Sequence, residues 1–214
     1  MVGMARPKEQ TARRRELVAA AGRAILRRGL TGLRVKDVAQ EAGLSAGSVS
    51  YYYRDLDDLV ADVHQDAVDR FYWARRRTVE AAGDPEAQLL ALVEQGVPDG
   101  GDPTSTVLYE LHLHAARSRT HAVLMTALFD REVSLYAGVL EAGRQQGVFA
   151  LDRATVDVVA VNAVALEDAF GLHLVGRNAH LDAPMARAHI LEFLRTATRA
   201  SLTPAGRGAR PPAG

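Results

Sequence analysis

The 214-residue chain carries 26 basic and 26 acidic residues, for a formal net charge of zero, and 48% of its residues are hydrophobic. These fractions are ordinary for a globular protein and exclude a disordered, collagen-like or fibrous chain. Because the sequence has no cysteine, it also excludes a disulfide framework, a cysteine-ligated zinc finger, an iron–sulfur cluster and a catalytic thiol.

Helical periodicity covers the chain, and no alternating strand pattern lasts more than a few residues. Pro, Gly and Asp stand at the points where helices should end or begin. The sequence therefore predicts an all-α fold of about nine helices. The first four are expected at residues 8–28, 35–42, 46–53 and 56–82. The fifth begins at residue 85 and ends at a loop at 96–101, and the sixth begins at residue 103. The last three are expected at 122–146, 153–175 and 184–202.

Local signals mark the ends of these helices. Glycines that can end a helix follow three of them, at Gly29, Gly147 and Gly176. Aspartates precede four of them and predict side-chain N-caps, at Asp84, Asp102, Asp152 and Asp182.

The neutral total charge hides an asymmetry along the chain. Residues 1–54 hold 11 basic and 4 acidic residues, a net charge of +7, whereas residues 55–214 carry −7. A split of this size suggests that the N-terminal segment meets a polyanion. The alternative is a basic helix face that contacts only solvent, and charge alone does not separate the two.

The segment from Val35 to Tyr53, VKDVAQEAGLSAGSVSYYY, has the pattern of a helix-turn-helix. Ala39 is a small residue that lets two helices approach closely, and Gly43 can adopt a positive φ at the turn. Ser45 is placed to cap the second helix. Since the motif lies inside the +7 segment, the N-terminal end of its second helix is predicted to enter the DNA major groove.

At these residues the sequence resembles the TetR family of bacterial regulators, over roughly residues 10–60. The resemblance is carried by Gly29, Val35-x-Asp37-Val38-Ala39, Ala42-Gly43-Leu44-Ser45-x-Gly47-Ser48, Tyr51-Tyr52-Tyr53 and Leu59. The segment from Ser50 to Asp55 looks most like the branch typified by BetI, the choline-responsive regulator. The family implies an all-α homodimer in which three N-terminal helices bind DNA and the C-terminal helices hold a small ligand and the dimer interface.

Carried over to this chain, the resemblance implies a set of DNA contacts in the helix-turn-helix. These residues are Arg34, Lys36, Ser45, Gly47, Ser48, Ser50, Tyr51 and Tyr52. Hydroxyl groups suit phosphates and base edges, although core packing is the alternative role for Tyr52 and for Tyr53. Two positions depart from the family: Arg34 replaces the usual Ser or Thr cap of the helix at residues 35–42, and Leu56 replaces a usual phosphate-binding lysine. Loss of that lysine should weaken sequence-independent affinity.

The last two expected helices suggest a dimer interface. Residues 153–175 are apolar nearly all round, and residues 184–202 carry an apolar stripe. Pairing both with their symmetry mates would give the four-helix interface that is usual in the family. The alternative is an intramolecular core.

Aromatic, Met and polar side chains on the C-terminal helices are candidates for lining a small-molecule site. Polar groups on an apolar helix are costly to bury unless they are paired or face a cavity. The candidate ligand-binding residues are Trp73, Tyr109, His112, Met125, Phe129, Tyr136, Asn162, Phe170 and His173. Core packing without ligand contact is the alternative for each.

No metal site, cofactor or enzymatic activity is expected. Glu110 and His114 are four residues apart and could share a metal ion, but no third ligand is evident nearby. The sequence contains no GxSxG, no HExxH and no phosphate-binding glycine loop.

The sequence thus predicts a cytoplasmic, ligand-responsive, homodimeric transcriptional regulator, a repressor that a small molecule releases from double-stranded operator DNA. Its expected parts are a helix-turn-helix domain at residues 1–54, a ligand-binding and dimerisation domain at 55–202 and a disordered tail at 203–214. No membrane partner is expected, because no run of about 18 uninterrupted apolar residues occurs and the N-terminus lacks the apolar core of a signal peptide. The alternatives are an activator, or a small-molecule or partner-binding helical protein with weak or vestigial DNA binding.

Overall fold

The computed structural model describes residues 7–97 and 102–202, and the predicted tail lies outside this range. Nine α-helices and one 3₁₀ turn are formed in the described residues, with no strand, which confirms the all-α prediction. The elements are α1 (Pro7–Arg28), α2 (Val35–Ala42), α3 (Ala46–Tyr52), α4 (Leu56–Ala81), α5 (Pro85–Gly96), α6 (Pro103–Ala115), α7 (Arg119–Gln145), η1 (Arg153–Thr155), α8 (Val156–Val175) and α9 (Ala183–Thr198).

The chain divides into two compact units, Met1–Trp73 with Gly101–Asp130, and Ala74–Gly100 with Arg131–Gly214. The first unit therefore holds α1–α3, the N-terminal part of α4, α6 and the start of α7. The second holds α5, α8 and α9 with the remaining parts of α4 and α7. The expected domain boundary after residue 54, which marks the end of the helix-turn-helix, stays a prediction.

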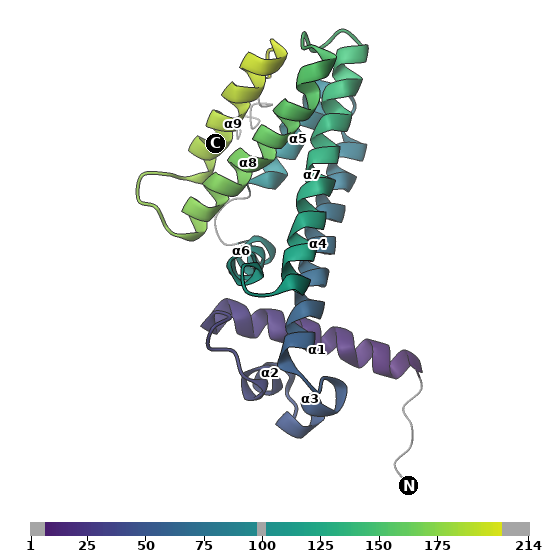
Figure 1. Ribbon diagram of the computed structural model, residues 1–214, viewed down its shortest axis with the longest axis vertical. Coiled ribbons are helices and arrows are strands. Elements are labelled where there is room, and N and C mark those ends of the chain that lie inside the picture. The colour runs from purple at the N-terminus through teal and green to yellow at the C-terminus, as the bar shows by residue number, and fades with distance from the viewer. Residues whose placement is uncertain (1–6, 98–101, 203–214) are drawn as a thin grey trace, which may run out of the picture. The chain divides into compact units, whose positions relative to one another are not determined.

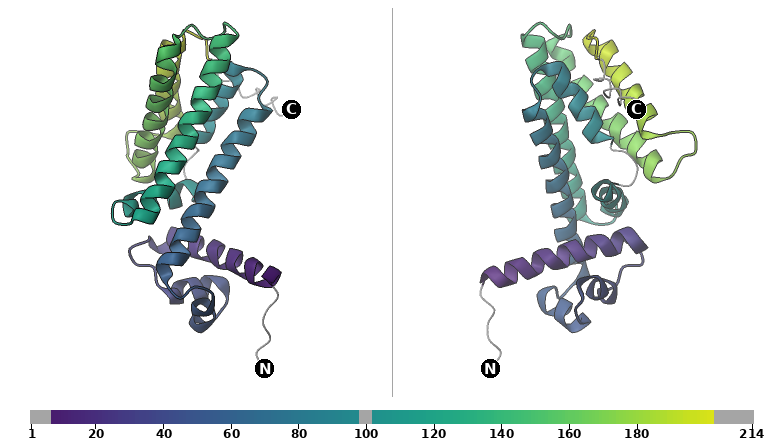
Figure 2. Two further views of the ribbon diagram at one scale, coloured as in Figure 1. Left: turned by 45° about the vertical axis from the view of Figure 1, so that its right-hand side comes forward. Right: turned by 180° about the vertical axis from the view of Figure 1, so that it is seen from behind.

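Within the first unit, α1 packs against α2 on one side and α6 on the other, as both views of Figure 2 show. One apolar core joins all these helices: it includes Leu17 of α1, Val38 of α2, Val49 of α3, Val63 of α4 and Leu111 of α6. The helix-turn-helix is thus held by side chains from α4 and α6 as well as by its own.

Within the second unit, α8 and α9 lie side by side, and α5 packs against both (Figure 1). Leu89 and Leu92 of α5, Ala160 and Val164 of α8 and Ile190 of α9 are all fully buried. The opposite faces of α8 and α9 are exposed and keep several large apolar side chains.

The predicted helix ends are mostly confirmed. Gly29, Gly43 and Gly147 all adopt positive φ, of 73°, 66° and 72°, a conformation that glycine reaches without steric cost. Three of the four aspartate caps form, because the carboxylates of Asp84, Asp102 and Asp182 accept backbone N–H groups at 2.6–2.8 Å.

The helix ends near α8 and α9 differ from the prediction. Asp152 makes no side-chain cap: its carbonyl instead accepts the Thr155 hydroxyl at 2.7 Å, and a 3₁₀ turn precedes α8. Gly176 has an ordinary φ of −71°, and the left-handed residue is the following Arg177, at 55°. The last helix ends at Thr198 rather than Leu202, because Arg199 takes the left-handed conformation there.

Candidate nucleic-acid interface and buried polar clusters

The first helix of the helix-turn-helix begins without the usual side-chain cap. Arg34 occupies the N-cap position of α2 and makes no side-chain cap hydrogen bond, as the sequence implied. Asp37 compensates, because its Oδ2 accepts the backbone N–H of Arg34 at 3.0 Å. The buried Asp37 carboxylate also lies 3.5 Å from the Arg28 guanidinium, so its charge is paired with the end of α1.

The turn and the start of the second helix form as predicted. Gly43 places the chain in the left-handed region, and the Oγ of Ser45 accepts the backbone N–H of Ser48 at 3.1 Å. The two serine hydroxyls are also within hydrogen-bond distance of each other, at 2.9 Å. This capped end of α3 is the end that would approach the major groove.

The side chains of α3 are divided between solvent and core. Tyr51 is 67% exposed, and Ser45, Gly47 and Ser50 are exposed as well. The tyrosine rings of Tyr51 and Tyr52 meet edge to face with centroids 5.1 Å apart, and Tyr52 is half-buried. The solvent-exposed side of α3, which includes the Tyr51 ring, can contact DNA without loss of core packing.

Tyr53 packs inward and fixes the end of α3. It is only 3% exposed, and its hydroxyl donates to Asp62 Oδ2 at 2.6 Å. The guanidinium of Arg14 lies over its ring, 4.5 Å from the centroid. Burial and the Asp62 carboxylate raise the pKa of Tyr53 to about 12, so the phenol stays neutral. Of the two roles considered for this residue, the structure gives it core packing.

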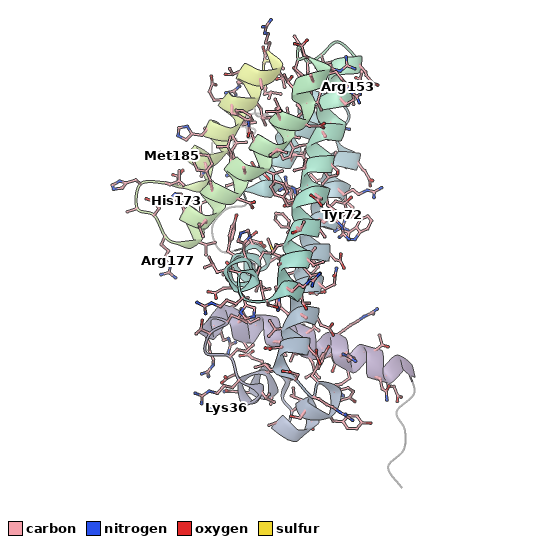
Figure 3. The ribbon with its side chains drawn as sticks, viewed as in Figure 1. Lys36, Tyr72, Arg153, His173, Arg177 and Met185 are labelled. Atoms are coloured by element: carbon pink, nitrogen blue, oxygen red, sulfur yellow. The ribbon has the colours of Figure 1, made fainter. Side chains whose placement is uncertain are left out.

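Exposed basic side chains lie on α1 and at the start of α2 in the same unit. Arg34, at the N-cap of α2, and Lys36 of α2 are exposed, and Figure 3 shows Lys36 pointing away from the helix. Arg13 and Arg14 of α1 pair with Glu16 and Asp62, at 2.5 and 3.5 Å. Both pairs are largely exposed, and such pairs are weak enough for a phosphate to replace one partner.

The candidate ligand-binding residues are distributed over both units. Trp73, Tyr109, His112, Met125 and Phe129 lie in the first unit, and Tyr136, Asn162, Phe170 and His173 in the second. Their environments also differ: Tyr136 is fully buried, Phe170 stacks on His189 with centroids 5.8 Å apart, and Asn162 and His173 are exposed. A common ligand site for these residues stays a prediction.

The second unit contains a buried ionic cluster at Tyr136, formed by Arg75, Glu132 and Glu167. Both terminal nitrogens of Arg75 donate to Glu167, at 2.8 and 3.1 Å, and Nη1 also donates to Glu132 at 2.9 Å. The Tyr136 hydroxyl donates to Glu167 Oε1 at 2.5 Å. Gly96 of α5 makes room for this carboxylate, because a Cβ there would overlap it.

Two carboxyl groups share one guanidinium in this cluster, so one of them lacks a full countercharge. Glu167 accepts three hydrogen bonds and is the better stabilised anion. Burial raises the pKa of Glu132 to about 8, although Arg75 opposes the shift. At neutral pH, Glu132 is therefore the group that carries the proton.

A second buried cluster lies in the first unit, where His64 and His121 form a hydrogen bond at 2.8 Å. Neither histidine was selected from the sequence, nor were Arg75 and Glu132. A signal was present, because His64 and Arg75 recur at the helical spacing of the buried residues Val60, Val68 and Val79 in α4. No group of three His, Asp or Glu that could hold a metal ion occurs in residues 7–97 and 102–202.

The comparisons with known proteins agree with these features. The family profile described as "Bacterial regulatory proteins, tetR family" matches residues 17–63, which span the helix-turn-helix. The chain is 26% identical to the HTH-type transcriptional repressor KstR2 of Rhodococcus jostii (strain RHA1), over 70% of this chain and 72% of that protein. It is 38% identical to the HTH-type transcriptional regulator BetI of Burkholderia cenocepacia (strain HI2424), over 41% of this chain and 45% of BetI.

The fold of the chain is similar to that of solved transcriptional regulators. A transcriptional regulator from Saccharomonospora viridis, solved in complex with choline, covers 86% of this chain with a TM-score of 0.80 and 23% identity, and 96% of that structure is matched. These relatives are transcriptional regulators, and the matched profile covers the segment whose exposed, capped second helix and basic surroundings fit a DNA groove. Residues 17–63 of the chain therefore match the segment that defines the TetR family of bacterial regulatory proteins, and most of the chain is similar to a transcriptional repressor.

Proposed function

We propose that this chain acts in the cytoplasm as a homodimeric repressor that holds its operator through α3 and releases it when a small molecule binds. The exposed face of α3 carries the proposal. Its polar and aromatic side chains face solvent, while Val49 and Tyr53 anchor the same helix in the core. A recognition helix needs this rigid support, because each base contact depends on a fixed position in the groove.

The net charge of +7 over residues 1–54 supplies the sequence-independent part of DNA binding. Leu56 and the acidic pair Asp57 and Asp58 lie at the start of α4, where they add no phosphate contact. Binding strength therefore depends on α1 and on the exposed α2 residues Arg34 and Lys36.

Dimerisation is supported by apolar surface on α8 and α9. The segment Arg153–Val175 is long and apolar enough to cross a membrane by length and composition, with a mean hydropathy of 1.6, yet only 33% of its most apolar 18-residue window is buried. Its exposed large side chains are Val158, Val161, Leu172 and Val175, joined by Met185 of α9. Exposed apolar side chains on two adjacent helices favour an interaction site, and a second copy of α8 and α9 would cover them in a four-helix interface.

A contact inside the first unit suggests how an effector could reach the DNA-binding helices. Glu110 of α6 accepts the backbone N–H of Leu30, just after α1, at 3.3 Å. A ligand that displaces α6 would therefore pull on the end of α1 and shift the population of recognition-helix arrangements. Fluorescence of Trp73, the only tryptophan, offers a direct titration, with choline as the first ligand to test.

The test is selection of binding sites from a random double-stranded DNA library, followed by fluorescence anisotropy with the enriched sequence. Tyr51→Ala should weaken specific binding by about 1–3 kcal/mol, since this exposed ring contributes nothing to the core. Lys36→Ala should weaken binding to all sequences and lower the salt dependence by about one counterion. Arg77→Ala, an exposed arginine of the second unit, serves as the matched charge control.

Each result separates the proposal from its alternatives. If no sequence is enriched, the chain is a small-molecule or partner-binding protein with vestigial DNA binding. Full affinity in the Tyr51→Ala variant would show that α3 is not the recognition helix.

A further inference from the structure

His64 of α4 and His121 of α7 form a buried pair in the first unit. The two side chains are 0% and 2% exposed. Their Nδ1 atoms lie 2.8 Å apart, and the rings are nearly parallel, at 17°, with centroids separated by 5.0 Å. One ring therefore donates its Nδ1–H and the other accepts it, so at least one imidazole is neutral.

The remaining nitrogen of His64 is also buried against protein. Its Nε2 lies 3.1 Å from the sulfur of Met125. Thioether sulfur is a weak acceptor, so it compensates a charge on the ring poorly. If both imidazoles were protonated, two Nδ1–H groups would point at each other across 2.8 Å. The closed pair can therefore hold at most one added proton, and even that proton would be buried.

The charged groups around the pair are mostly histidines. On α6, His114 contacts His121 edge to face with centroids 4.9 Å apart, and His112 lies close enough to act on His64 electrostatically. On α4, Asp57 acts on His121 with the opposite sign. Burial, together with His121, His112 and His114, lowers the pKa of His64 to about 4. Burial and His114 lower the pKa of His121, against the opposing effect of Asp57.

The pair is placed where its opening would affect the DNA-binding helices. Val60, one turn before His64, and the adjacent Val63 belong to the core that contains Leu17 of α1 and Val49 of the recognition helix. Met125 packs against the same core from α7. Separation of His64 from His121 would loosen the support that α4 and α7 give to α1 and α3.

We propose that the His64–His121 pair is an acid-sensitive latch, which keeps the DNA-binding unit in its operator-competent arrangement at neutral pH and opens on acidification. The inference rests on the proposed operator binding and adds a second input to it, the proton. An imidazole with a pKa of about 4 in the closed pair and 6.5 when exposed favours the open arrangement about 30-fold more at pH 5 than at pH 7.5.

The experiment measures affinity for the selected DNA between pH 7.5 and pH 5.0 at constant ionic strength. The wild-type protein should lose up to about 30-fold in affinity over this range. In the His64→Leu/His121→Leu variant the pair cannot take up protons, so affinity should stay constant or rise as the protein becomes more positive. His180→Gln removes an exposed histidine of the second unit and should behave as the wild type.

A second readout does not require DNA. In the NMR titration of the full-length protein, His64 should titrate well below the ordinary histidine range. An ordinary pKa for His64, or parallel pH profiles of wild type and double variant, would overturn the latch while leaving operator binding intact. No DNA binding at pH 7.5 would instead overturn the proposed function. If the double variant does not fold, His121→Asn keeps a hydrogen-bonding group opposite His64 and removes one titrating ring.

Discussion

Replacement of Glu132 by glutamine tests the charge imbalance of the buried Arg75 cluster. Glu132 is 5% exposed and shares Arg75 with Glu167, which accepts hydrogen bonds from both terminal nitrogens of that guanidinium. Glutamine has nearly the same shape and still offers Arg75 an acceptor oxygen, but it cannot ionise. The variant therefore changes the charge of the cluster while it preserves the packing.

The expected magnitude follows from linkage between protonation and folding. The pKa of Glu132 is about 8 in the folded protein and near 4.5 in the unfolded chain. Between these values the folded state binds a proton that the unfolded state has released, so stability falls as pH rises. The slope from this group is about 1.4 kcal/mol per pH unit, or roughly 4 kcal/mol between pH 5 and pH 8.

The assay is urea unfolding at pH 5, 6, 7 and 8, followed by far-UV circular dichroism at one protein concentration. The free energy of unfolding of the wild type should fall relative to that of Glu132→Gln across this range, because the other titrating groups, His64 among them, act on both proteins alike. The two proteins should therefore be close at pH 5 and differ by several kcal/mol at pH 8. Glu80→Gln, at an exposed i,i+4 pair with Arg76, should follow the wild type. Identical pH profiles for wild type and Glu132→Gln would refute the assignment of the proton to Glu132.

Three further variants test other parts of the structure. Gly96→Ala should destabilise the protein by about 1–3 kcal/mol in urea unfolding, because the new Cβ would overlap the Glu167 carboxylate; wild-type stability would argue against the tight packing of α5 on α8. Arg34→Ser should stabilise the protein by about 1 kcal/mol, since serine can supply the missing side-chain cap of α2, while operator affinity measured by anisotropy should fall. Val161→Arg, on the exposed face of α8, should yield monomers in analytical ultracentrifugation, whereas Val123→Arg, also exposed but on α7, should not; a Val161→Arg protein that remains dimeric would rule out the proposed interface.

The helix-turn-helix depends on local structure, and its turn and the cap of α3 form where the sequence predicted them. Ser45 caps α3 and Gly43 makes the turn because both effects involve atoms only a few residues apart. The exposed side of α3 could be predicted from the position of its apolar residue, because α3 has only seven residues, or two turns, and one buried position at Val49. Contact between the predicted residues and DNA stays a prediction.

The ligand-binding candidates were chosen by residue type, and the structure separates them into different environments. Aromatic rings serve core and ligand equally well, so composition cannot distinguish Tyr136, which binds Glu167, from a residue that lines a cavity. The polar candidates Asn162 and His173 of α8 are exposed. Their surroundings depend on which surface a second chain covers, and one sequence does not contain that information.

The sequence by itself determined the helices, most of their ends and the helix-turn-helix, because hydrophobic periodicity, caps and turns are interactions between near neighbours in the chain. It also determined that the neutral chain consists of a +7 segment and a −7 remainder. Only the tertiary structure decided which charges and histidines are buried together. Arg75 meets Glu167 across 92 residues and His64 meets His121 across 57, and such pairings depend on how separate helices pack. The same residues exposed on a surface would be ordinary solvated groups. Burial instead makes the His64–His121 contact depend on protonation, and it makes the Arg75 cluster hold one buried proton.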